Sequence, residues 1–308
     1  MTATLSLVDA ASSVVARSNA PLVREFDISL LVGRLFRDKH LDGAPLRIRK
    51  EAAESSDVSR AIDGLLTKGL LQSPADIPYS GLFESPGETL PAEQVVCFMD
   101  PLCYLSHLSA MQWYGITDRR PKPIQISSPR GTLWTTKTGA LMASALTQSS
   151  WTGGEPTDSI VRGRFAWRNF PSRIRGHAIE RYQDSYWQSA NYDEASGLRV
   201  STVGRTYLDM IRSPGQCGGI RHVLDVFEEH GRRHRNLIVR EVNEFGTKLD
   251  KSRVGYILDE MLGVDVDSSP TLTTWLSTAV QRGGSRKLDP DADYAPVFSE
   301  RWCLSLNI

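Results

Sequence analysis

The chain has 308 residues, and its 36 basic and 36 acidic side chains give a formal net charge of zero. Hydrophobic residues make up 40% and charged residues 23%, a composition that is typical of a globular protein and excludes a disordered chain. No apolar run approaches the ~18 residues of a membrane-spanning helix, and four cysteines are too few for a disulfide framework. Residues 1–20 also lack the basic start of a secretory signal, so we expect a cytoplasmic protein of two domains, away from membranes.

We expect residues 1–23 to form a flexible N-terminal arm. Apolar residues then recur at helical spacing over residues 28–36, which predicts an amphipathic helix of about three turns. Gly43-Ala44-Pro45 interrupts the chain after this helix. Residues 47–54 follow, and we predict that they form a short second helix that is basic at its start.

The third predicted helix has the clearest pattern in this part of the chain. Ser55-Ser56-Asp57 offers capping side chains at its start, and Gly69 ends it. Its apolar residues follow the i, i+3, i+4, i+7, i+8 rule: Val58, Ala61, Ile62, Leu65 and Leu66. Residues 70–72 are then predicted to begin a strand, with a turn over residues 74–86 before the chain returns.

This order of elements predicts a winged helix-turn-helix over residues 24–96, with the third helix free to enter the major groove. Arg60 is the best candidate for a base edge or a phosphate, and short polar or basic side chains around it are candidates for phosphate contacts. The candidate DNA-binding residues here are Arg47, Arg49, Lys50, Ser55, Ser56, Ser59 and Arg60. A three-helix bundle used only for protein contacts would have the same apolar spacing, and this alternative stays open.

The zero net charge hides an uneven distribution along the sequence. Residues 119–182 hold 11 basic and three acidic side chains, whereas the flanking regions are acidic. The block is either a solvated face or a surface for phosphate or an acidic protein. Its candidate DNA-binding residues are Arg162, Arg164, Arg168, Arg173 and Arg175.

Patterns that carry catalysis or bind a metal or cofactor are missing from the sequence. There is no phosphate-binding Gly-rich loop, and the arginines beside His230 and His234 disfavour a zinc site. Ser285, Asp289 and Asp291 have a remote likeness to a nucleotidyltransferase core, but they are too close together and Pro290 interrupts them. We therefore predict a protein that is not an enzyme and needs no cofactor, and we interpret residues 284–293 as a surface loop.

Three blocks carry a resemblance to a known family. They are residues 104–118 (Tyr-Leu-Ser-His-Leu-Ser-Ala-Met-Gln-Trp-Tyr-Gly-Ile-Thr-Asp), residues 205–211 (Arg-Thr-Tyr-Leu-Asp-Met-Ile) and residues 253–258 (Arg-Val-Gly-Tyr-Ile-Leu). In these three segments the chain resembles the AbiEi family. Its members are antitoxins of type IV toxin–antitoxin systems that act in phage defence. With the predicted winged helix, the resemblance extends over about residues 25–308.

The resemblance implies an α+β protein in which a winged helix-turn-helix precedes a mixed α/β antitoxin domain over residues 97–308. It implies that the winged helix binds inverted repeats upstream of its own operon and represses it, and that the second domain adds a basic surface for DNA. The partner implied is a nucleotidyltransferase toxin, neutralised without a stable complex. The alternative function is a protein-interaction module that neutralises its partner directly, without binding DNA.

The residues of these blocks also have structural interpretations. His107 is expected to be a hydrogen-bonded histidine of the protein interior. We expect Gly115 to close a helix that ends near Trp113. Gly255, between Arg253 and Tyr256, predicts close helix packing.

Overall fold

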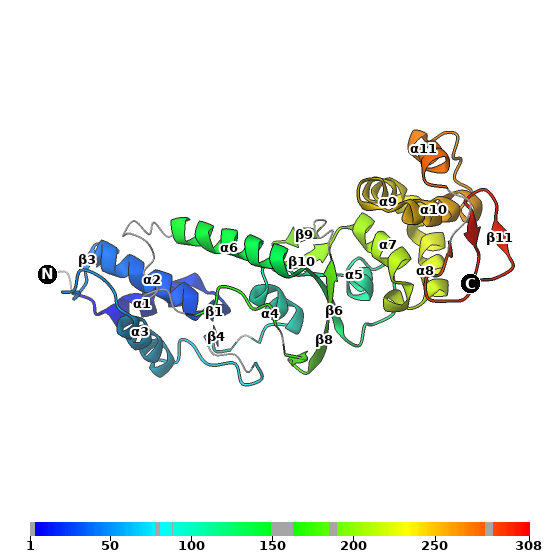
Figure 1. Ribbon diagram of the computed structural model, residues 1–308. Coiled ribbons are helices and arrows are strands. Elements are labelled where there is room, and N and C mark those ends of the chain that lie inside the picture. Colours follow the sequence, from blue (N-terminus) through cyan, green and yellow to red (C-terminus); the bar gives the residue numbers. More distant parts are fainter. Residues whose placement is uncertain are drawn as a thin grey trace. The chain divides into compact units, whose positions relative to one another are not determined.

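The computed structural model describes residues 4–77, 81–87, 89–148, 163–169, 171–184, 190–280 and 286–308 (Figure 1). The fold is mixed α/β, with a sheet that contains both parallel and antiparallel strand pairs. The chain divides into two compact units. The first comprises Met1–Leu102 and Arg130–His177, and the second comprises Cys103–Pro129 and Ala178–Ile308. The division that we predicted between residues 96 and 97 thus differs from the observed one, because the chain returns to the first unit after residue 129.

The first unit is mainly helical. Its elements are α1 (Leu7–Ser18), β1 (Leu22–Arg24), α2 (Glu25–Asp38), β2 (His40–Leu41), β3 (Ala44–Pro45), α3 (Ser55–Thr67), β4 (Leu82–Glu84), α4 (Ala92–Met99), α6 (Gly131–Gln148) and β7 (Arg173–Ile174).

Helix α1 replaces the flexible arm that we predicted for residues 1–23, and that prediction is wrong. Ser6 caps the helix by accepting a hydrogen bond from the backbone N–H of Asp9 at 3.1 Å. Leu7, Ala10 and Ala11 are buried in the core that α1 shares with α2 and α3. Burial of one face of α1 supplies the free energy that orders this segment.

The spacing of apolar residues predicted α2 and α3, and both are confirmed. Their buried sides form one core with α1. The short helix predicted over residues 47–54 is absent. Instead Leu46 pairs with Leu5 in a parallel bridge, and the Arg47 N–H donates to the Leu5 carbonyl at 2.9 Å. Backbone hydrogen-bonding groups at the start of this segment are therefore bound to the distant Leu5 and not to one another, as they would be in a helix.

The strand pairing after α3 differs from the prediction. β4 lies within the residues that we assigned to a turn, and it pairs with β1 in antiparallel fashion, with Val23 opposite Phe83. Of residues 70–72, only Gln72 pairs with β4, as a single bridge to Glu84.

The returning segment of the first unit is fixed to α4 by two hydrogen bonds. Near the start of α6, the indole N–H of Trp134 donates to Asp100 at 3.0 Å. Further along, the backbone N–H of Trp167 donates to the Met99 carbonyl at 2.9 Å, and the Trp167 side chain is buried. These contacts account for the discontinuous first unit.

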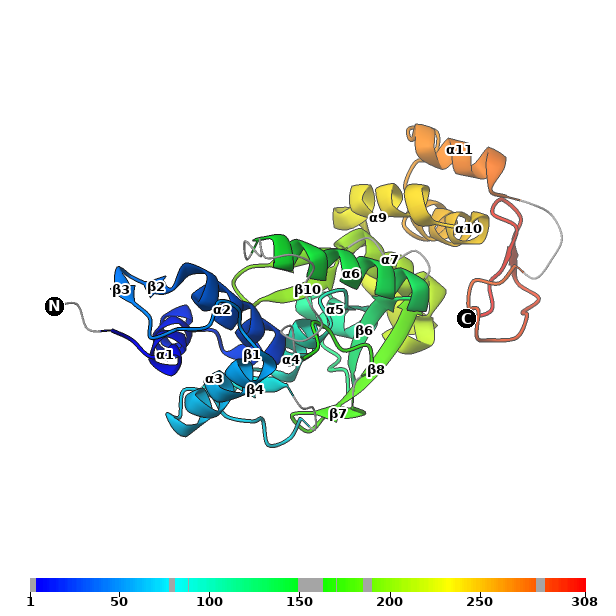
Figure 2. The ribbon, with the colours of Figure 1, turned by 60° about the vertical axis from the view of Figure 1, so that its left-hand side comes forward.

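The second unit contains a sheet with the strand order β8-β6-β5-β10-β9. Strand β6 (Ile124–Pro129) is buried along its whole length. It runs parallel to β8 (His177–Asp184) and antiparallel to β5 (Tyr104–Leu105), and Figure 2 shows β6 and β8 side by side. β10 (Leu198–Ser201) lies parallel to β5 and antiparallel to β9 (Ala190–Asp193).

The helices of the second unit are α5 (His107–Trp113), α7 (Val203–Arg212), a 3₁₀ turn (Pro214–Cys217), α8 (Ile220–Val226), α9 (Arg232–Phe245), α10 (Lys248–Tyr256) and α11 (Pro270–Thr278). A hairpin of β11 (Phe298–Ser299) and β12 (Leu304–Ser305) follows. Gly115 ends α5 with φ +64°, as predicted. Gly255 makes a close contact, but with the ring of Trp302 in the turn between β11 and β12 and not with the helix that close helix packing would require.

Within the described part of the chain, every helix is too short or too polar to cross a lipid bilayer.

Candidate nucleic-acid interface

Helix α3 has one buried and one exposed face, as a helix that reads DNA requires. Val58, Ala61 and Leu65 are fully buried. A stripe of four residues at spacings of four, three and four lies on the exposed side, and these residues are Ser56, Arg60, Asp63 and Thr67. The stripe therefore holds one cation, one anion and two short hydroxyl side chains within reach of a partner.

The start of α3 is closed by a capping box between Glu54 and Asp57. The buried Asp57 carboxylate accepts the Glu54 backbone N–H at 3.0 Å, and it pairs with Arg60 at 3.1 Å and with Lys50 at 3.4 Å. Lys50 also pairs with Glu54 at 2.9 Å. Hydrogen bonds to Glu54 and Asp57 raise the pKa of Lys50 above its ordinary value.

This cluster, which we call the Asp57 cluster, holds two cations and two anions: Lys50, Arg60, Glu54 and Asp57. A phosphate would have to compete with two carboxylates for Lys50 and Arg60. Both candidate residues nevertheless remain accessible, because 47% of the Lys50 side chain and 63% of the Arg60 side chain are exposed. Arg60 therefore remains accessible to a base edge or a phosphate, although its ion pair with Asp57 competes for it.

Arg47 and Arg49 lie in the segment that leads to α3, and both are exposed. Neither has a carboxylate within ion-pair distance among the residues that the structure describes. The hydrogen bond from the Arg47 N–H to the Leu5 carbonyl fixes the backbone of this segment. Arg47 and Arg49 therefore carry exposed positive charges just before α3 in the sequence.

The candidate serines have local partners. Ser59 Oγ donates to the Ser55 carbonyl at 3.3 Å, which is ordinary helix chemistry. Ser56 Oγ lies 3.5 Å from Glu54 Oε2 and is exposed. Ser56 is thus the most accessible of the three, whereas Ser55 and Ser59 are partly buried.

The second group of candidate arginines belongs to the first unit and not, as predicted, to a C-terminal domain. Its segment packs on the start of α2, where the Phe165 and Phe26 rings are 5.3 Å apart in a T-shaped pair. A Cβ on Gly163 would lie 2.6 Å from the Glu25 Cβ. Both groups of candidate residues therefore share one compact unit with α3.

The arginines of this group have different environments. Arg164, Arg168 and Arg173 are exposed. Arg168 lies beside the start of α6, since a Cβ on Gly131 would come 2.8 Å from its guanidinium, and Arg173 donates to the Gly176 carbonyl at 3.1 Å. Arg162 lies outside the described residues.

Arg175 is the exception, and the structure argues against its predicted role at a DNA surface. Its guanidinium pairs with Asp76 at 2.7 Å and with Glu84 on β4. Only 16% of the side chain is exposed. Both terminal nitrogens of its guanidinium bind carboxylates, so Arg175 joins β4 to its own loop and has a structural role.

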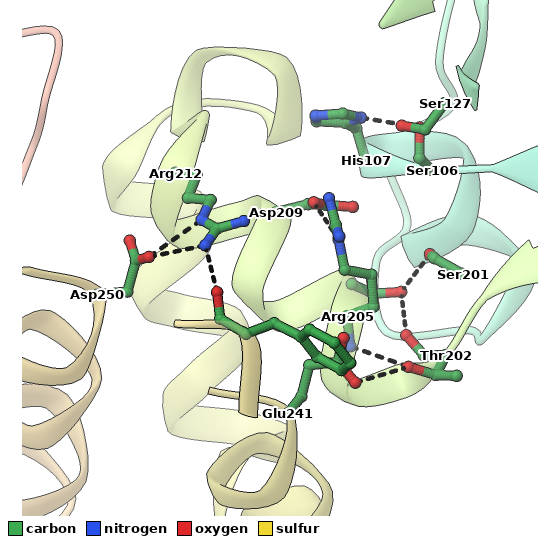
Figure 3. A network of polar contacts seen from close by, with 12 residues as sticks. Ser106, His107, Ser127, Ser201, Thr202, Arg205, Asp209, Arg212, Glu241 and Asp250 are labelled. Atoms are coloured by element: carbon green, nitrogen blue, oxygen red, sulfur yellow. Dashed lines mark hydrogen bonds and ion pairs between the residues drawn. The ribbon is translucent and has the colours of Figure 1, made fainter. Parts of the chain in front are cut away.

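The sequence analysis missed a network of polar side chains in the second unit (Figure 3). Arg205 donates to Asp209 at 2.8 Å within α7, and both side chains are buried. Arg212 pairs with Asp250 of α10 at 2.9 Å, and Thr202, the cap of α7, lies 3.4 Å from Glu241 of α9. The network joins α7 to α9 and α10. The i, i+4 spacing of Arg205 and Asp209 was the one signal in the sequence.

A second part of the network surrounds His107. Its Nδ1 lies 2.9 Å from Ser106 Oγ, which also accepts a hydrogen bond from Ser127 Oγ at 2.9 Å. His107 is buried, and its ring lies 4.2 Å from the Tyr182 ring at a tilt of 42°. Burial and the Glu180 carboxylate raise the pKa of Tyr182 well above its ordinary value. These contacts agree with the interior role expected of His107.

Residues that we weighed for catalysis have structural contacts. Asp289 accepts the backbone N–H of Asp291 at 2.9 Å, so it orders the turn that follows. His234 lies 3.1 Å from the Tyr207 hydroxyl. Ser285 is outside the described residues. Over the ranges that the structure describes, no three His, Cys, Asp or Glu side chains form a group that could hold a metal ion.

No protein-family model matches the sequence, and no curated protein matches it. Among solved structures, the crystal structure of the RV2827C protein from Mycobacterium tuberculosis is similar to this chain with a TM-score of 0.49 and 13% sequence identity. The match covers 99% of this chain and 92% of that one. A likeness of this degree assigns neither a family nor a function.

Proposed function

We propose that this chain is a DNA-binding transcriptional autorepressor and a type IV antitoxin. The observation that carries the proposal is the exposed stripe of α3 that includes Arg60, preceded in the sequence by the exposed Arg47 and Arg49. Helix side chains reach base edges in the major groove, and flanking arginines bind phosphates.

The arrangement of the first unit supports a winged helix-turn-helix as the DNA-binding element. Helix α3 follows α2 and packs with it on α1. β4 comes after α3 and pairs with β1, which precedes α2. In this proposal α3 enters the major groove, and the segment of Arg164, Arg168 and Arg173 contacts the DNA backbone.

The antitoxin part of the proposal depends on the resemblance of residues 104–118, 205–211 and 253–258 to the AbiEi family. We propose as DNA target inverted repeats upstream of the chain's own operon. The proposed partner is a nucleotidyltransferase toxin, counteracted in the cytoplasm without a stable complex. The chain itself is proposed to have no catalytic activity.

Fluorescence anisotropy with DNA from upstream of the chain's own reading frame tests DNA binding. We expect Arg60→Ala to weaken binding and to relax discrimination between the native site and a scrambled one. Arg47→Ala with Arg49→Ala should weaken both alike, and should reduce the slope of log affinity against log salt by about 1.8, at about 0.9 per lost phosphate contact.

The matched control is Arg17→Ala with Arg37→Ala. It removes two exposed arginines of the same unit, each paired with an aspartate. It should leave the salt slope unchanged. Equal effects of the two double variants, with circular dichroism reporting intact folds, would contradict an interface at α3.

A protein-interaction module is the second candidate, and one observation favours it. Leu141 and Met142 on α6 are about two-fifths exposed, and Lys137 is the one charged residue of that helix. Such a surface suits an apolar partner. This candidate would be selected if the chain co-elutes stoichiometrically with the neighbouring toxin and does not bind DNA. Leu141→Glu should then abolish the co-elution.

A further inference from the structure

The second unit contains a cavity of about 560 Å³ between α9 and the start of α11, far in sequence from the residues discussed for DNA. Ten residues line it, and eight of them are polar or charged: Arg235, Asn236, Val239, Arg240, Asn243, Glu244, Ser268, Ser269, Pro270 and Thr271. Its volume falls within the range of about 300–1,000 Å³ that is usual for small-molecule sites.

One wall of the cavity is made by two neighbouring rows of α9. Residues four apart lie on the same side of a helix, so Arg235, Val239 and Asn243 form one row. Asn236, Arg240 and Glu244 form the other. The two arginines are thus about 7.5 Å apart along the helix axis, at 1.5 Å per residue. Their long side chains can converge on one group.

Arg235 and Arg240 are exposed, and within the described chain neither is in an ion pair. Glu244 is the only acid among the described lining residues, and it is not in an ion pair either. Two guanidinium groups with open donors at one cavity suit a doubly charged phosphate, because each can bind two of its oxygens.

Asn243 adds donors with a fixed orientation. Its Oδ1 accepts a hydrogen bond from the indole N–H of the buried Trp275 at 3.0 Å. Because this contact fixes which end of the amide carries oxygen, the two N–H groups of Asn243 are left for another acceptor.

The other lining groups point to the rest of the ligand. Among the described residues, the lining holds no aromatic ring that could stack on a nucleobase. Asn236, Ser269 and Thr271 are groups that exchange hydrogen bonds with hydroxyls, and the Glu244 carboxylate accepts them. A carboxylate is a poor neighbour for a bare phosphate, but it is a good acceptor for a sugar hydroxyl.

We propose that this cavity binds a free phosphorylated sugar. The terminal phosphate lies between Arg235 and Arg240, and the sugar hydroxyls face Glu244 and the segment of Ser269 and Thr271. The proposal is independent of DNA binding by the first unit, and either can fail without the other.

Isothermal titration calorimetry on the full chain tests the site with ribose 5-phosphate, ribose and inorganic phosphate. We expect ribose 5-phosphate to bind at least tenfold more tightly than either fragment. Arg235→Ala with Arg240→Ala should weaken it by at least tenfold. Glu244→Gln should weaken ribose 5-phosphate but leave inorganic phosphate unchanged or slightly tighter.

The control variant is Arg232→Ala with Arg233→Ala, which removes two exposed arginines of the same helix from outside the cavity lining. It should bind ribose 5-phosphate as the unaltered chain does. Equal weakening by both double variants would overturn the proposal, since it would reduce the effect to general charge. A failure to bind ribose 5-phosphate at millimolar concentration would also overturn the proposal. So would binding of a single-stranded oligonucleotide that lacks a terminal phosphate instead of ribose 5-phosphate.

Discussion

The indole ring of Trp302 lies directly against the backbone of Gly255. A Cβ built on Gly255 would come 2.2 Å from Cζ3 of this ring, which is far inside van der Waals contact. Trp302 is fully buried, and its Nε1–H donates to Asp259 at 2.9 Å. The C-terminal segment is therefore held on α10 by an aromatic side chain that accepts only glycine beneath it.

Gly255→Ala should destabilise the second unit by about 1–3 kcal/mol, because the added methyl group overpacks this contact. Chemical denaturation followed by tryptophan fluorescence measures the loss. Gly139→Ala in α6 is the control, since a Cβ there meets nothing within 4 Å and should stabilise its helix by about 0.5–1 kcal/mol. Equal stabilities of the Gly255 variant and the unaltered chain would show that Trp302 can move aside.

The contact between α1 and α3 makes a second prediction. A Cβ on Gly64 would lie 2.4 Å from Cγ1 of Val8, so Gly64→Ala should cost about 1–3 kcal/mol. Val8→Ala in the Gly64→Ala background should restore part of that loss, because it removes the methyl group in the way. A double-mutant cycle by denaturation checks this coupling. Simple additivity of the two changes would place α1 elsewhere.

Asp57→Asn should raise the affinity of the chain for DNA. The change removes one negative charge from the Asp57 cluster and releases Lys50 and Arg60 towards phosphates. It should also cost about 1 kcal/mol of stability, since it weakens the cap of α3. Asp42→Asn, which frees Arg17 at a distance in sequence from α3, is the charge-matched control in the anisotropy assay. Lower affinity with an intact fold would mean that Asp57 orients Arg60 for binding.

The Asp9–Lys68 pair should make stability depend on pH in the acid range. The hydrogen bond from Lys68, at 2.7 Å, is the main reason why the pKa of Asp9 falls from 3.8 to about 2. A lowered pKa in the folded state gives stability that is present above the unfolded pKa and lost as pH falls from about 3.8 to 2. Both side chains are well exposed, so the effect should stay below about 1 kcal/mol.

Lys68→Met tests this pair. The variant should be slightly less stable than the unaltered chain at pH 6, with a difference that shrinks on approach to pH 2. Carboxyl NMR should find the Asp9 midpoint moved back towards 3.8. Lys137→Met removes an exposed lysine of the same unit and should leave that midpoint in place; a midpoint that moves in both variants would discredit the pairing.

The buried Arg205–Asp209 pair should be costly to break and less costly to replace. Asp209→Asn or Arg205→Met alone should destabilise the chain by about 3–5 kcal/mol, because each leaves a buried charge without its partner. Arg205→Met with Asp209→Leu should cost less than the sum of the single changes. Unfolding in urea measures all three. Strict additivity would mean that the two groups act independently despite their 2.8 Å contact.

Local patterns predicted the elements whose burial depends on residues near them in sequence. α2 and α3 have large apolar side chains at helical spacing, and both were found. α1 escaped prediction because much of its buried face is Ala10, Ala11 and Ser12, whose small side chains give a weak signal. Residues 47–54 are not helical, because the partner of Leu46 lies more than forty residues earlier, at Leu5.

The candidate site was predictable in its exposed members and not in its paired ones. Exposure of Arg60 follows from its position opposite the apolar face of α3, and Arg47 and Arg49 are exposed in the segment before that helix. Arg175 is paired with two carboxylates, those of Asp76 and Glu84. They lie 99 and 91 residues away in the sequence. No local pattern could reveal them, and the same is true of the contact between Arg212 and Asp250.

The interleaving of the two units constrains the order in which the chain folds during synthesis. The first unit is complete only when residues 130–177 have left the ribosome, although its first helices emerge more than a hundred residues earlier. β6 must likewise wait for β8, more than fifty residues downstream, to cover its edge. Nascent α1–α3 and a β6 that can pair only with β5 therefore coexist for several seconds at about 5–20 residues per second. A chain that stops at residue 129 carries both an unfinished helical unit and an open strand edge, so we expect chaperones to bind it.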